Sequence, residues 1–163
     1  MTLIDESKIR DDDPERLTAA LAQAKADALL QKIKRPALLI TSDNLCVCNN
    51  AVLEKPKDET EARLMLDMVA KYPAYCISAV AVTHTGSGKR AVAVDKAIVH
   101  FNPIPKHVLD QYIAEGHPYV RAGAFSIRLP LLQPYIDRIE GDIECVIGLS
   151  MALTKKLIAE VQN

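Results

Sequence analysis

The chain has 163 residues, 49% hydrophobic and 25% charged, and its 20 basic and 21 acidic side chains leave a net charge of −1. A chain of this length is typical of one domain and buries enough surface to fold without disulfides or metal staples. The balanced charge argues against broad electrostatic capture of a nucleic-acid polymer or an acidic membrane. No secretory signal opens the sequence, and no apolar run is long enough to span a bilayer. We therefore expect one soluble, cytoplasmic domain over residues 1–163.

The four cysteines, Cys46, Cys48, Cys76 and Cys145, form no CxxC pair and no Cys-His pair at the spacing of a zinc site. Free thiols are the expectation in a reducing compartment. Cys46 and Cys48 alternate along a predicted strand and so share one face. We interpret them as small core residues rather than as a redox pair.

The first third of the chain predicts a helix followed by a strand. Pro14 suits a first helical position with Asp13 as its N-cap, and segment 14–32 has apolar residues at helical spacing. The predicted apolar stripe consists of Leu17, Ala20, Leu21, Ala24, Ala28 and Leu29. The apolar run 37–40 then predicts a buried strand that continues to Cys48, and the pair Asn49-Asn50 predicts a tight hairpin turn.

The middle third predicts a second helix and a hairpin. Asp58 and Glu61 form a capping box for a helix that Pro73 stops. Segments 75–83 and 90–101 predict two strands around the tetrapeptide Gly86-Ser87-Gly88-Lys89. That tetrapeptide lacks the spacing and the following helix of a phosphate loop, so we interpret it as a plain turn.

The last third predicts a helix that begins at Pro105 and has Gly116 as its C-cap, followed by three more elements. Residues 131–139 predict a short helix, residues 143–149 a strand, and residues 150–162 a closing helix. Leu153, Leu157, Ile158 and Val161 of the closing helix are expected to face inward. Strands interspersed with helices predict an α/β domain with a mixed, partly parallel sheet flanked by helices.

Asp43 is the first candidate for chemistry. It follows four apolar residues and a Thr-Ser pair, near the end of the predicted buried strand. Ligand sites of open α/β sheets gather at strand ends, where a carboxylate acts as a metal ligand or as a base that activates water. The alternative is a structural cap for the next turn, and position alone does not decide between the two.

Two lysines are candidate ligands for an anion. Lys25 interrupts an alanine-rich helix, and its charge must reach water or an anion; the alternative is a lysine whose stem snorkels to the surface. Lys55 lies just past the predicted hairpin, which folds its segment back toward Asp43. The alternative for Lys55 is a solvated run of charges. Gly123, in a small-residue segment, would allow close approach of the backbone to a ligand.

Six segments, taken in order, resemble the Maf family, whose members are also called septum formation protein homologues, and the resemblance extends over nearly the whole chain. The segments are Ile4-Asp5-Glu6, Leu21 to Ala26, Leu39 to Asp43, Glu54 to Asp58, Arg121 to Phe125, and Ile139 to Asp142 with Val146 to Leu149. The resemblance implies a Maf/ITPase-like α/β fold. It also implies a hydrolase, a nucleoside triphosphate pyrophosphatase that releases a nucleoside monophosphate and pyrophosphate.

The resemblance further implies pyrimidine or modified nucleoside triphosphates as substrates, Mg²⁺ or Mn²⁺ as the cofactor, and a homodimer. By resemblance Asp43 is the catalytic aspartate, Lys25 and Lys55 bind the phosphates, and Glu6 lies near the metal beside Asp43. Two lysines and a metal would stabilise charge on the leaving pyrophosphate, while the carboxylate orients or deprotonates water. Arg128 stands near the place where the family reads the base, so Arg128 and Gly123 are candidate substrate ligands.

The sequence also departs from the family pattern. It is expected to start after the family's first strand and its Ser/Arg-rich loop, which grips the triphosphate. Asn44 stands where a Thr usually follows the catalytic aspartate. Two other functions therefore stay open: a weak or inactive homologue that binds nucleotides or a partner protein, and a structural protein whose exposed sheet edge pairs with another subunit.

Overall fold

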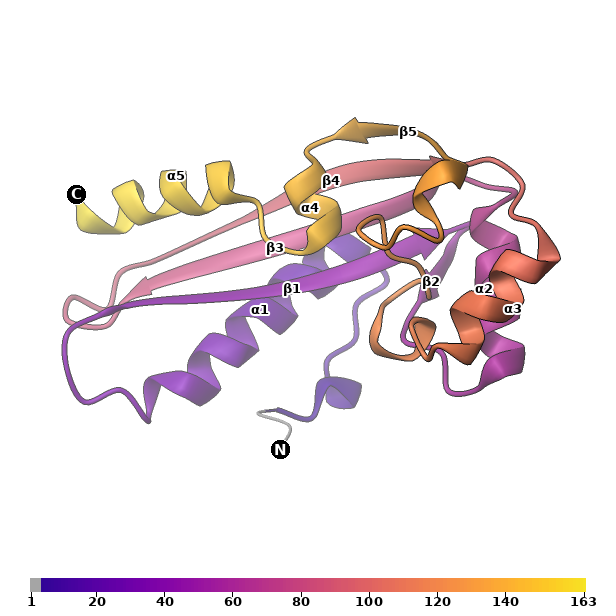
Figure 1. Cartoon of the computed structure of the whole chain (residues 1–163). Helices are drawn as coiled ribbons and strands as arrows, with labels where there is room; N and C mark the ends of the chain where they lie inside the picture. Colours follow the sequence, from indigo (N-terminus) through magenta and orange to yellow (C-terminus); the bar gives the residue numbers. More distant parts are fainter. Residues whose placement is uncertain (1–3) are drawn as a thin grey trace. The chain divides into compact units, whose positions relative to one another are not determined.

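A five-stranded sheet with helices on both of its faces forms the backbone of the computed structural model, which describes residues 4–163 (Figure 1). The strand order is β2-β1-β3-β4-β5. The strands are β1 (Leu38–Cys48), β2 (Ala51–Leu53), β3 (Ala74–His84), β4 (Arg90–Phe101) and β5 (Ile136–Gly141). The α/β class predicted from the sequence is confirmed.

Neighbouring strands of the sheet run antiparallel, so the expectation of a partly parallel sheet is wrong. The cause is the hairpin that joins β1 to β2. Asn49 and Asn50 have φ angles of 48° and 62°, the left-handed pair that a two-residue type I′ turn requires. This turn reverses the chain before the next helix, over residues 59–69, so that helix connects β2 to β3. Strands β2 and β3 run in the same direction, but β1 lies between them in the sheet.

The described residues divide into two compact units, which share the three long strands of the sheet. The first unit contains residues 4–44, 77–95 and 148–163, and the second contains residues 45–76 and 96–147. Each unit is described below by itself. The expectation of a single domain over residues 1–163 stays a prediction.

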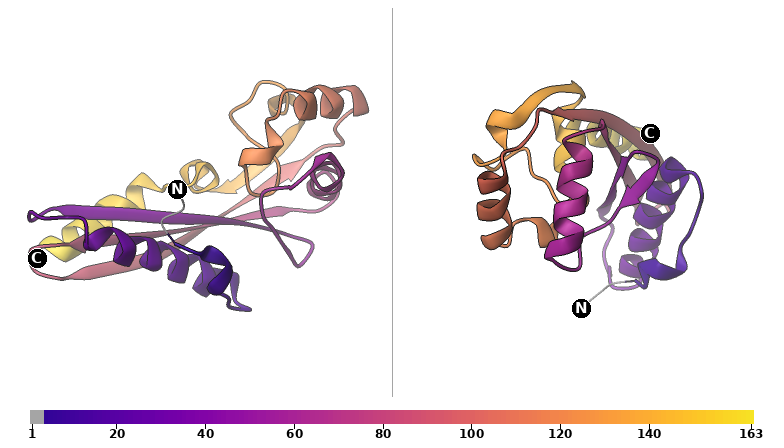
Figure 2. Two further views of the ribbon diagram at one scale, coloured as in Figure 1. Left: turned by 90° about the horizontal axis from the view of Figure 1, so that it is seen from below. Right: turned by 90° about the vertical axis from the view of Figure 1, so that its right-hand side faces the viewer.

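In the first unit, α1 (Pro14–Leu30) and α5 (Met151–Gln162) cover opposite faces of the sheet (Figure 2). Alternate residues of β3 make these two contacts, as the two-residue period of a strand requires. Ala79 and Ala81 pack with Ala22 of α1. On the other face, Val80 and Val82 pack with the apolar stripe of α5, which is formed by Leu153, Leu157, Ile158 and Val161.

Helix α1 begins as the sequence predicts, but its buried face matches the predicted apolar stripe only in part, at Leu17 and Leu21. Asp13 accepts hydrogen bonds from the backbone N–H groups of Glu15 and Arg16, which confirms the N-cap. The buried residues are Leu17, Thr18, Leu21, Ala22 and Ala26, whereas the predicted Ala20, Ala24 and Ala28 are only half-buried. Alanines occur on every side of this helix, so hydrophobic periodicity does not determine which side is buried.

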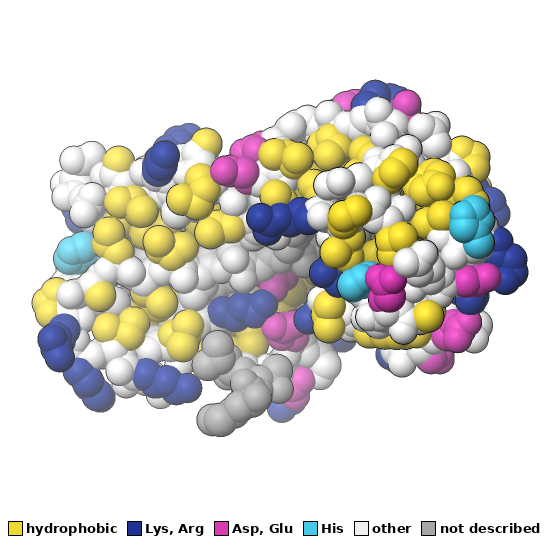
Figure 3. All heavy atoms as spheres, in the orientation of Figure 1, with side chains coloured by type: hydrophobic (Ala, Val, Ile, Leu, Met, Phe, Trp, Pro, Cys, Tyr) yellow, Lys and Arg dark blue, Asp and Glu magenta, His cyan; other side chains and the backbone are white. Residues whose placement is uncertain are grey.

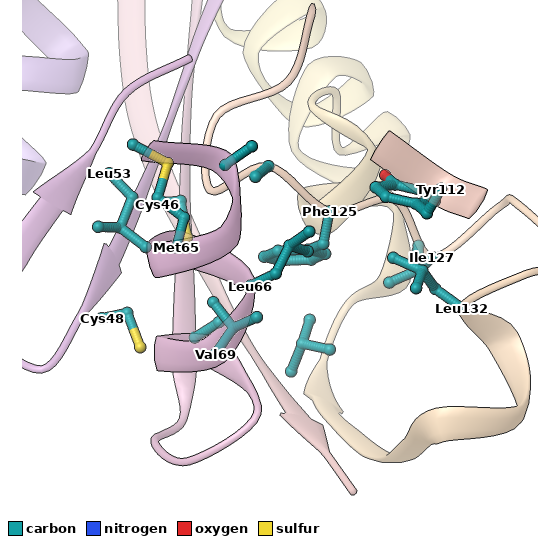
Figure 4. Close-up of a cluster of buried hydrophobic side chains, with 14 of the residues drawn as sticks. Cys46, Cys48, Leu53, Met65, Leu66, Val69, Tyr112, Phe125, Ile127 and Leu132 are labelled. Atoms are coloured by element: carbon teal, nitrogen blue, oxygen red, sulfur yellow. The ribbon is translucent and has the colours of Figure 1, made fainter. Parts of the chain in front are cut away.

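In the second unit, α2 (Glu59–Val69) and α3 (Lys106–Ala114) pack over the ends of the strands and enclose an apolar core (Figure 4). Asp58 accepts from the Glu61 N–H at 2.9 Å, which confirms the predicted cap of α2. Arg63 of α2 forms an ion pair with Asp110 of α3 at 2.7 Å. Leu66, Tyr112 and Leu132, all fully buried, are among the largest side chains of this core.

The predicted helix over residues 131–139 is absent from the structure. A single 3₁₀ turn, η3 (Gln133–Tyr135), precedes strand β5. Pro134 lacks the N–H that a helix would use at that position. The residues that follow instead pair with β4, with Ile139 opposite Val99 and Arg138 opposite His100. Partners distant in the sequence therefore override the local helical spacing.

The predicted strand over residues 143–149 is a short helix, α4 (Ile143–Ile147). Asp142 starts it by accepting a hydrogen bond from the Glu144 N–H at 2.9 Å. Gly148 follows with a φ of 111°, which ends the helix. The apolar run alone favoured a strand, but the two flanking residues carried the signal for a helix. At α3, the C-cap is Glu115, and Gly116 is the next residue with a φ of 76°.

The turn around Gly86-Ser87-Gly88-Lys89 is a plain hairpin connection, as predicted, because the Gly88 N–H donates to the His84 carbonyl at 2.9 Å. Basic and acidic side chains are interspersed over the face shown in Figure 3, apart from a basic group at the lower left, over the loop after α1. The exposed cations of that loop are Lys32, Lys34 and Arg35. Among residues 4–163, no helix is long and apolar enough to cross a membrane.

The four cysteines are free and buried, which confirms their interpretation as core residues. Burial raises the pKa of Cys48 to about 11. A hydrogen bond with Cys76, together with burial, raises the pKa of Cys46 well above its ordinary value. The thiolate is the reactive form of cysteine, so the raised pKa values make Cys46 and Cys48 unreactive, and burial shields all four sulfurs in the folded chain.

We therefore expect slow labelling of the native protein by an aromatic disulfide reagent at pH 8. At that pH only about one Cys48 thiol in a thousand is ionised, and the sulfur is shielded by the core. Unfolding in urea should release all four thiols at the rate of free cysteine. Rapid labelling of even one thiol in the native protein would contradict this description of the core.

Candidate active site

A lysine from α1 and an aspartate from β1 meet in the first unit. The Lys25 ammonium donates a hydrogen bond to Asp43 Oδ1, and it also forms an ion pair with Glu6 Oε1 at 3.1 Å. The Asp43 side chain is only 9% exposed, against 24% for Lys25 and 48% for Glu6. Three residues that the sequence analysis selected separately are therefore brought together.

Asp43 lies in the middle of a strand rather than near its end. Strand β1 continues for five residues beyond it to Cys48, and the turn comes only at Asn49-Asn50. The interpretation of Asp43 as a cap for the next turn is therefore wrong. A strand can continue past Asp43 because a charged partner from α1 meets its buried carboxylate.

The charge of Lys25 is stabilised by its two carboxylate partners. Burial alone would lower the pKa of Lys25, but the hydrogen bond and the charge of Asp43 outweigh burial, and Glu6 adds to their effect. The net pKa is raised above the ordinary value of lysine. Lys25 is therefore an ammonium ion throughout the neutral range, and its charge is directed at the strand rather than toward bulk water.

Glu6 reaches Lys25 from a short turn that precedes α1. The 3₁₀ helix η1 (Glu6–Lys8) is capped by Asp5, whose side chain accepts from the backbone and the hydroxyl of Ser7. Arg10 donates to the Glu6 carbonyl at 3.2 Å and closes the turn on its other side. Local bonds thus fix the backbone of Glu6, while its half-exposed side chain extends to Lys25.

The donor set of the first unit suits a metal that is shared with a phosphate ligand. Glu6 and Asp43 both contact Lys25 Nζ, so two carboxylates lie within reach of one small cation position. Mg²⁺ is commonly held by one or two carboxylates, with water and substrate phosphates completing its shell. Among residues 4–163, no group of three His, Cys, Asp or Glu side chains gathers into an all-protein cage.

In the second unit, Gly123 lies against the segment that contains Lys55. The Gly123 N–H donates to the carbonyls of Leu53 at 3.1 Å and Glu54 at 3.3 Å. Its φ is 72°, and the φ of the next residue, Ala124, is 64°. The backbone at Gly123 thus lies against the chain itself, and its approach to a ligand stays a prediction. Lys55 is exposed beside this contact.

Arg128 is exposed five residues after Gly123, and its backbone N–H donates to Ser126 Oγ at 3.3 Å. The structure therefore joins Gly123 to the backbone next to Lys55, and it joins Lys25, Asp43 and Glu6. The two groups belong to different units.

Two contacts near Asp43 were not predicted from the sequence. Thr41 donates a hydrogen bond from its hydroxyl to the carbonyl of Ala22 at 2.7 Å, which ties β1 to α1. Asn44 packs against Gly148, where an added Cβ would lie 3.4 Å from Asn44 Nδ2. The two-residue period of a strand was a usable signal for Thr41, because it places Thr41 and Asp43 on the same face.

Comparison with known proteins identifies relatives over nearly the whole chain. The family of Maf-like proteins matches residues 2–161. The 7-methyl-GTP pyrophosphatase of Dictyostelium discoideum is 34% identical over 98% of this chain and 84% of its own length. The nucleoside triphosphate pyrophosphatase of Salinispora tropica is 34% identical over 97% of this chain and 71% of its own length. The dTTP/UTP pyrophosphatase of Vibrio parahaemolyticus is 31% identical, with coverages of 96% and 82%.

We expect Gly123→Ala to destabilise the protein more than Gly116→Ala does. Both glycines have a φ above 70°, so alanine strains the backbone at either position by about 1 kcal/mol. At Gly116 an added Cβ meets nothing within 4 Å, whereas at Gly123 it would lie 2.6 Å from the buried Cys46 Sγ. Gly123→Ala should therefore cost about 2 kcal/mol or more in urea denaturation. Equal losses in the two variants would show that this contact is not tight.

Proposed function

Because the chain belongs to the Maf-like protein family, we propose that it is a nucleoside triphosphate pyrophosphatase. In this reaction water attacks the α-phosphorus, the bond from that phosphorus to the bridging oxygen breaks, and a nucleoside monophosphate and pyrophosphate leave. The structural observation that carries the proposal is the buried carboxylate of Asp43, which the Lys25 ammonium holds in place from the facing helix.

Asp43 is proposed as the residue that orients the attacking water and accepts its proton. Its side chain is buried among fixed groups, so it does not need to reorganise during the reaction. Lys25 is unsuited to that role, because its raised pKa keeps it protonated at neutral pH. We assign Lys25 to hold Asp43 and to supply positive charge to the phosphates.

Lys55 is proposed to bind the leaving pyrophosphate. It is exposed, so its ammonium is free to meet a ligand that arrives from solvent. Charge on the bridging oxygen grows as the bond to the α-phosphorus breaks, and a cation there stabilises the transition state more than the ground state. Arg128, also exposed, is the candidate residue for contacting the base.

A divalent cation belongs to the proposal, with Glu6 and Asp43 as the residues that would hold it. When bound, Mg²⁺ or Mn²⁺ supplies positive charge to the triphosphate. Pyrimidine or modified nucleoside triphosphates are the proposed substrates, in line with the names of the relatives. A cytoplasmic location and a homodimer stay predictions.

Asp43→Asn should abolish turnover while leaving the chain folded. Asparagine keeps the size of the side chain but cannot accept the proton, so we expect kcat to fall about 10²-fold or more. The measurement is pyrophosphate release from UTP, dTTP, CTP, 7-methyl-GTP and ATP with Mg²⁺. Asp67→Asn, at an exposed residue paired with Lys71, is the matched control and should retain full activity. Full turnover by Asp43→Asn would refute the assigned role, and nucleotide binding without turnover by the unaltered chain would identify an inactive homologue.

Lys55→Ala should weaken binding of a triphosphate more than binding of the matching monophosphate. The added phosphates carry the charge that a lysine recognises. The Kd of the monophosphate divided by the Kd of the triphosphate should therefore fall by about tenfold. Lys57→Ala, which removes another exposed lysine two residues away, serves as the control. If Lys55→Ala weakens both ligands by the same factor, Lys55 is an ordinary surface residue.

A further inference from the structure

Small side chains form the contact between α1 and the sheet. Ala22 and Ala26 of the helix are completely buried, and Ala22 packs in a cluster with Ala79 and Ala81 of β3. Alanine faces allow a helix to approach a sheet closely, but their attraction is not directional. This cluster alone therefore resists rotation or sliding of α1 only weakly.

The sequence of α1 does not set its rotation either. Alanines stand on all sides of the helix, and of the predicted apolar stripe only Leu17 and Leu21 are among the buried residues. Lys25 lies between Ala22 and Ala26, so a small rotation of α1 would carry its ammonium away from the strand. A directional contact is needed to keep Lys25 against Asp43.

The buried hydroxyl of Thr41 provides that contact. It donates to the Ala22 carbonyl at 2.7 Å, and the Thr41 residue is 7% exposed. A carbonyl oxygen has two lone pairs, so Ala22 accepts this bond without giving up its bond within the helix. Thr41 and Asp43 lie on one face of β1, and Ala22 and Lys25 are neighbours on the surface of α1. The two cross-links therefore run side by side.

We propose that Thr41 is a positioning residue, whose hydrogen bond to the Ala22 carbonyl sets the register of α1 on β1 and thereby holds Lys25 against Asp43. The consequence for catalysis rests on the proposed function. The geometric statement about Lys25 does not, because the ion pair is a property of the folded chain alone.

The side-chain chemistry of Thr41 gives a sharp set of variants. Thr41→Val keeps the shape and removes the donor, and it leaves no orphaned acceptor, because Ala22 keeps its helical bond. Thr41→Ser keeps the hydroxyl and loses a methyl group. Thr41→Ala removes the donor with a smaller side chain and serves as the second variant if Thr41→Val does not fold.

The first measurement is the contact between the Lys25 ammonium and the Asp43 carboxylate in crystal structures of the unaltered chain and its variants. The unaltered chain should show the ion pair. Thr41→Val should separate the two groups, because α1 is no longer tied to β1 at Ala22. Thr41→Ser should restore the contact. An unchanged Lys25–Asp43 contact in folded Thr41→Val, or in folded Thr41→Ala, would overturn the proposal.

Thr18→Val is the matched control for loss of a buried threonine bond. Thr18 lies on the same helix, is completely buried, and donates to the Pro14 carbonyl at 2.5 Å. That bond stays within α1, so its loss should lower stability and leave the contact between Lys25 and Asp43 unchanged. A displacement of Lys25 in Thr18→Val equal to that in Thr41→Val would show general loosening of α1, and the proposal would fail.

The second measurement is the kinetics of pyrophosphate release. Thr41→Val should lower kcat by about tenfold to a hundredfold, the scale of misplacing a catalytic group, with KM changed less than twofold. Thr41→Ser should recover most of kcat. If kcat of Thr41→Val is unchanged while Lys25 shifts, the link to catalysis is refuted. If the unaltered chain releases no pyrophosphate, the proposed function fails, and the structures of the variants still decide whether Thr41 positions the pair.

Discussion

The ion pair between Lys25 and Asp43 is the constraint on which the rest of the first unit depends. A carboxylate that is nine-tenths buried in the middle of a strand requires a partner, because an unpaired buried charge costs about 3–5 kcal/mol. That partner arrives from α1, so the helix must lie close to the sheet. The alanines at the contact permit this approach, and Glu6 adds a second carboxylate at the more exposed side of Lys25. The arrangement leaves a carboxylate and an ammonium fixed before any substrate arrives, which is the preorganisation that phosphoryl chemistry uses.

In the second unit, which contains the other parts of the same three long strands, the constraint is close apolar packing. Its core is apolar, and the backbone at Gly123 approaches so closely that a side chain would meet the Cys46 sulfur. This approach fixes the segment from which Lys55 extends into solvent. A rigid backbone beneath an exposed cation suits the capture of a flexible anionic ligand, because less freedom is lost on binding. The first unit thus contains a buried ion pair, and the second contains an exposed lysine on a fixed backbone segment.

Elements with strong local signals were predicted correctly. Asp13 and Asp58 begin helices by accepting backbone N–H bonds, and Asn49-Asn50 forms the expected turn, because each of these residues acts on groups within three positions of itself. The prediction of a helix over residues 131–139 failed for the opposite reason, because strand β5 forms only through its pairing with β4, which is distant in the sequence. In residues 143–149 the apolar run led to the prediction of a strand. Asp142 and Gly148, whose local effects begin and end the helix, were signals that the sequence already contained.

By itself the sequence determined the family, the caps and turns, the free core cysteines and the identities of the candidate residues. Local hydrogen bonds and segment-by-segment resemblance need no knowledge of distant contacts. Only the tertiary structure decided which face of α1 is buried, that Asp43 lies in mid-strand, and that Lys25, Glu6 and Asp43 share one cluster. The reason is physical. An alanine-rich helix presents nearly equivalent faces, so its rotation is chosen by polar groups on the strand that it packs against, and those contacts join residues far apart in the sequence.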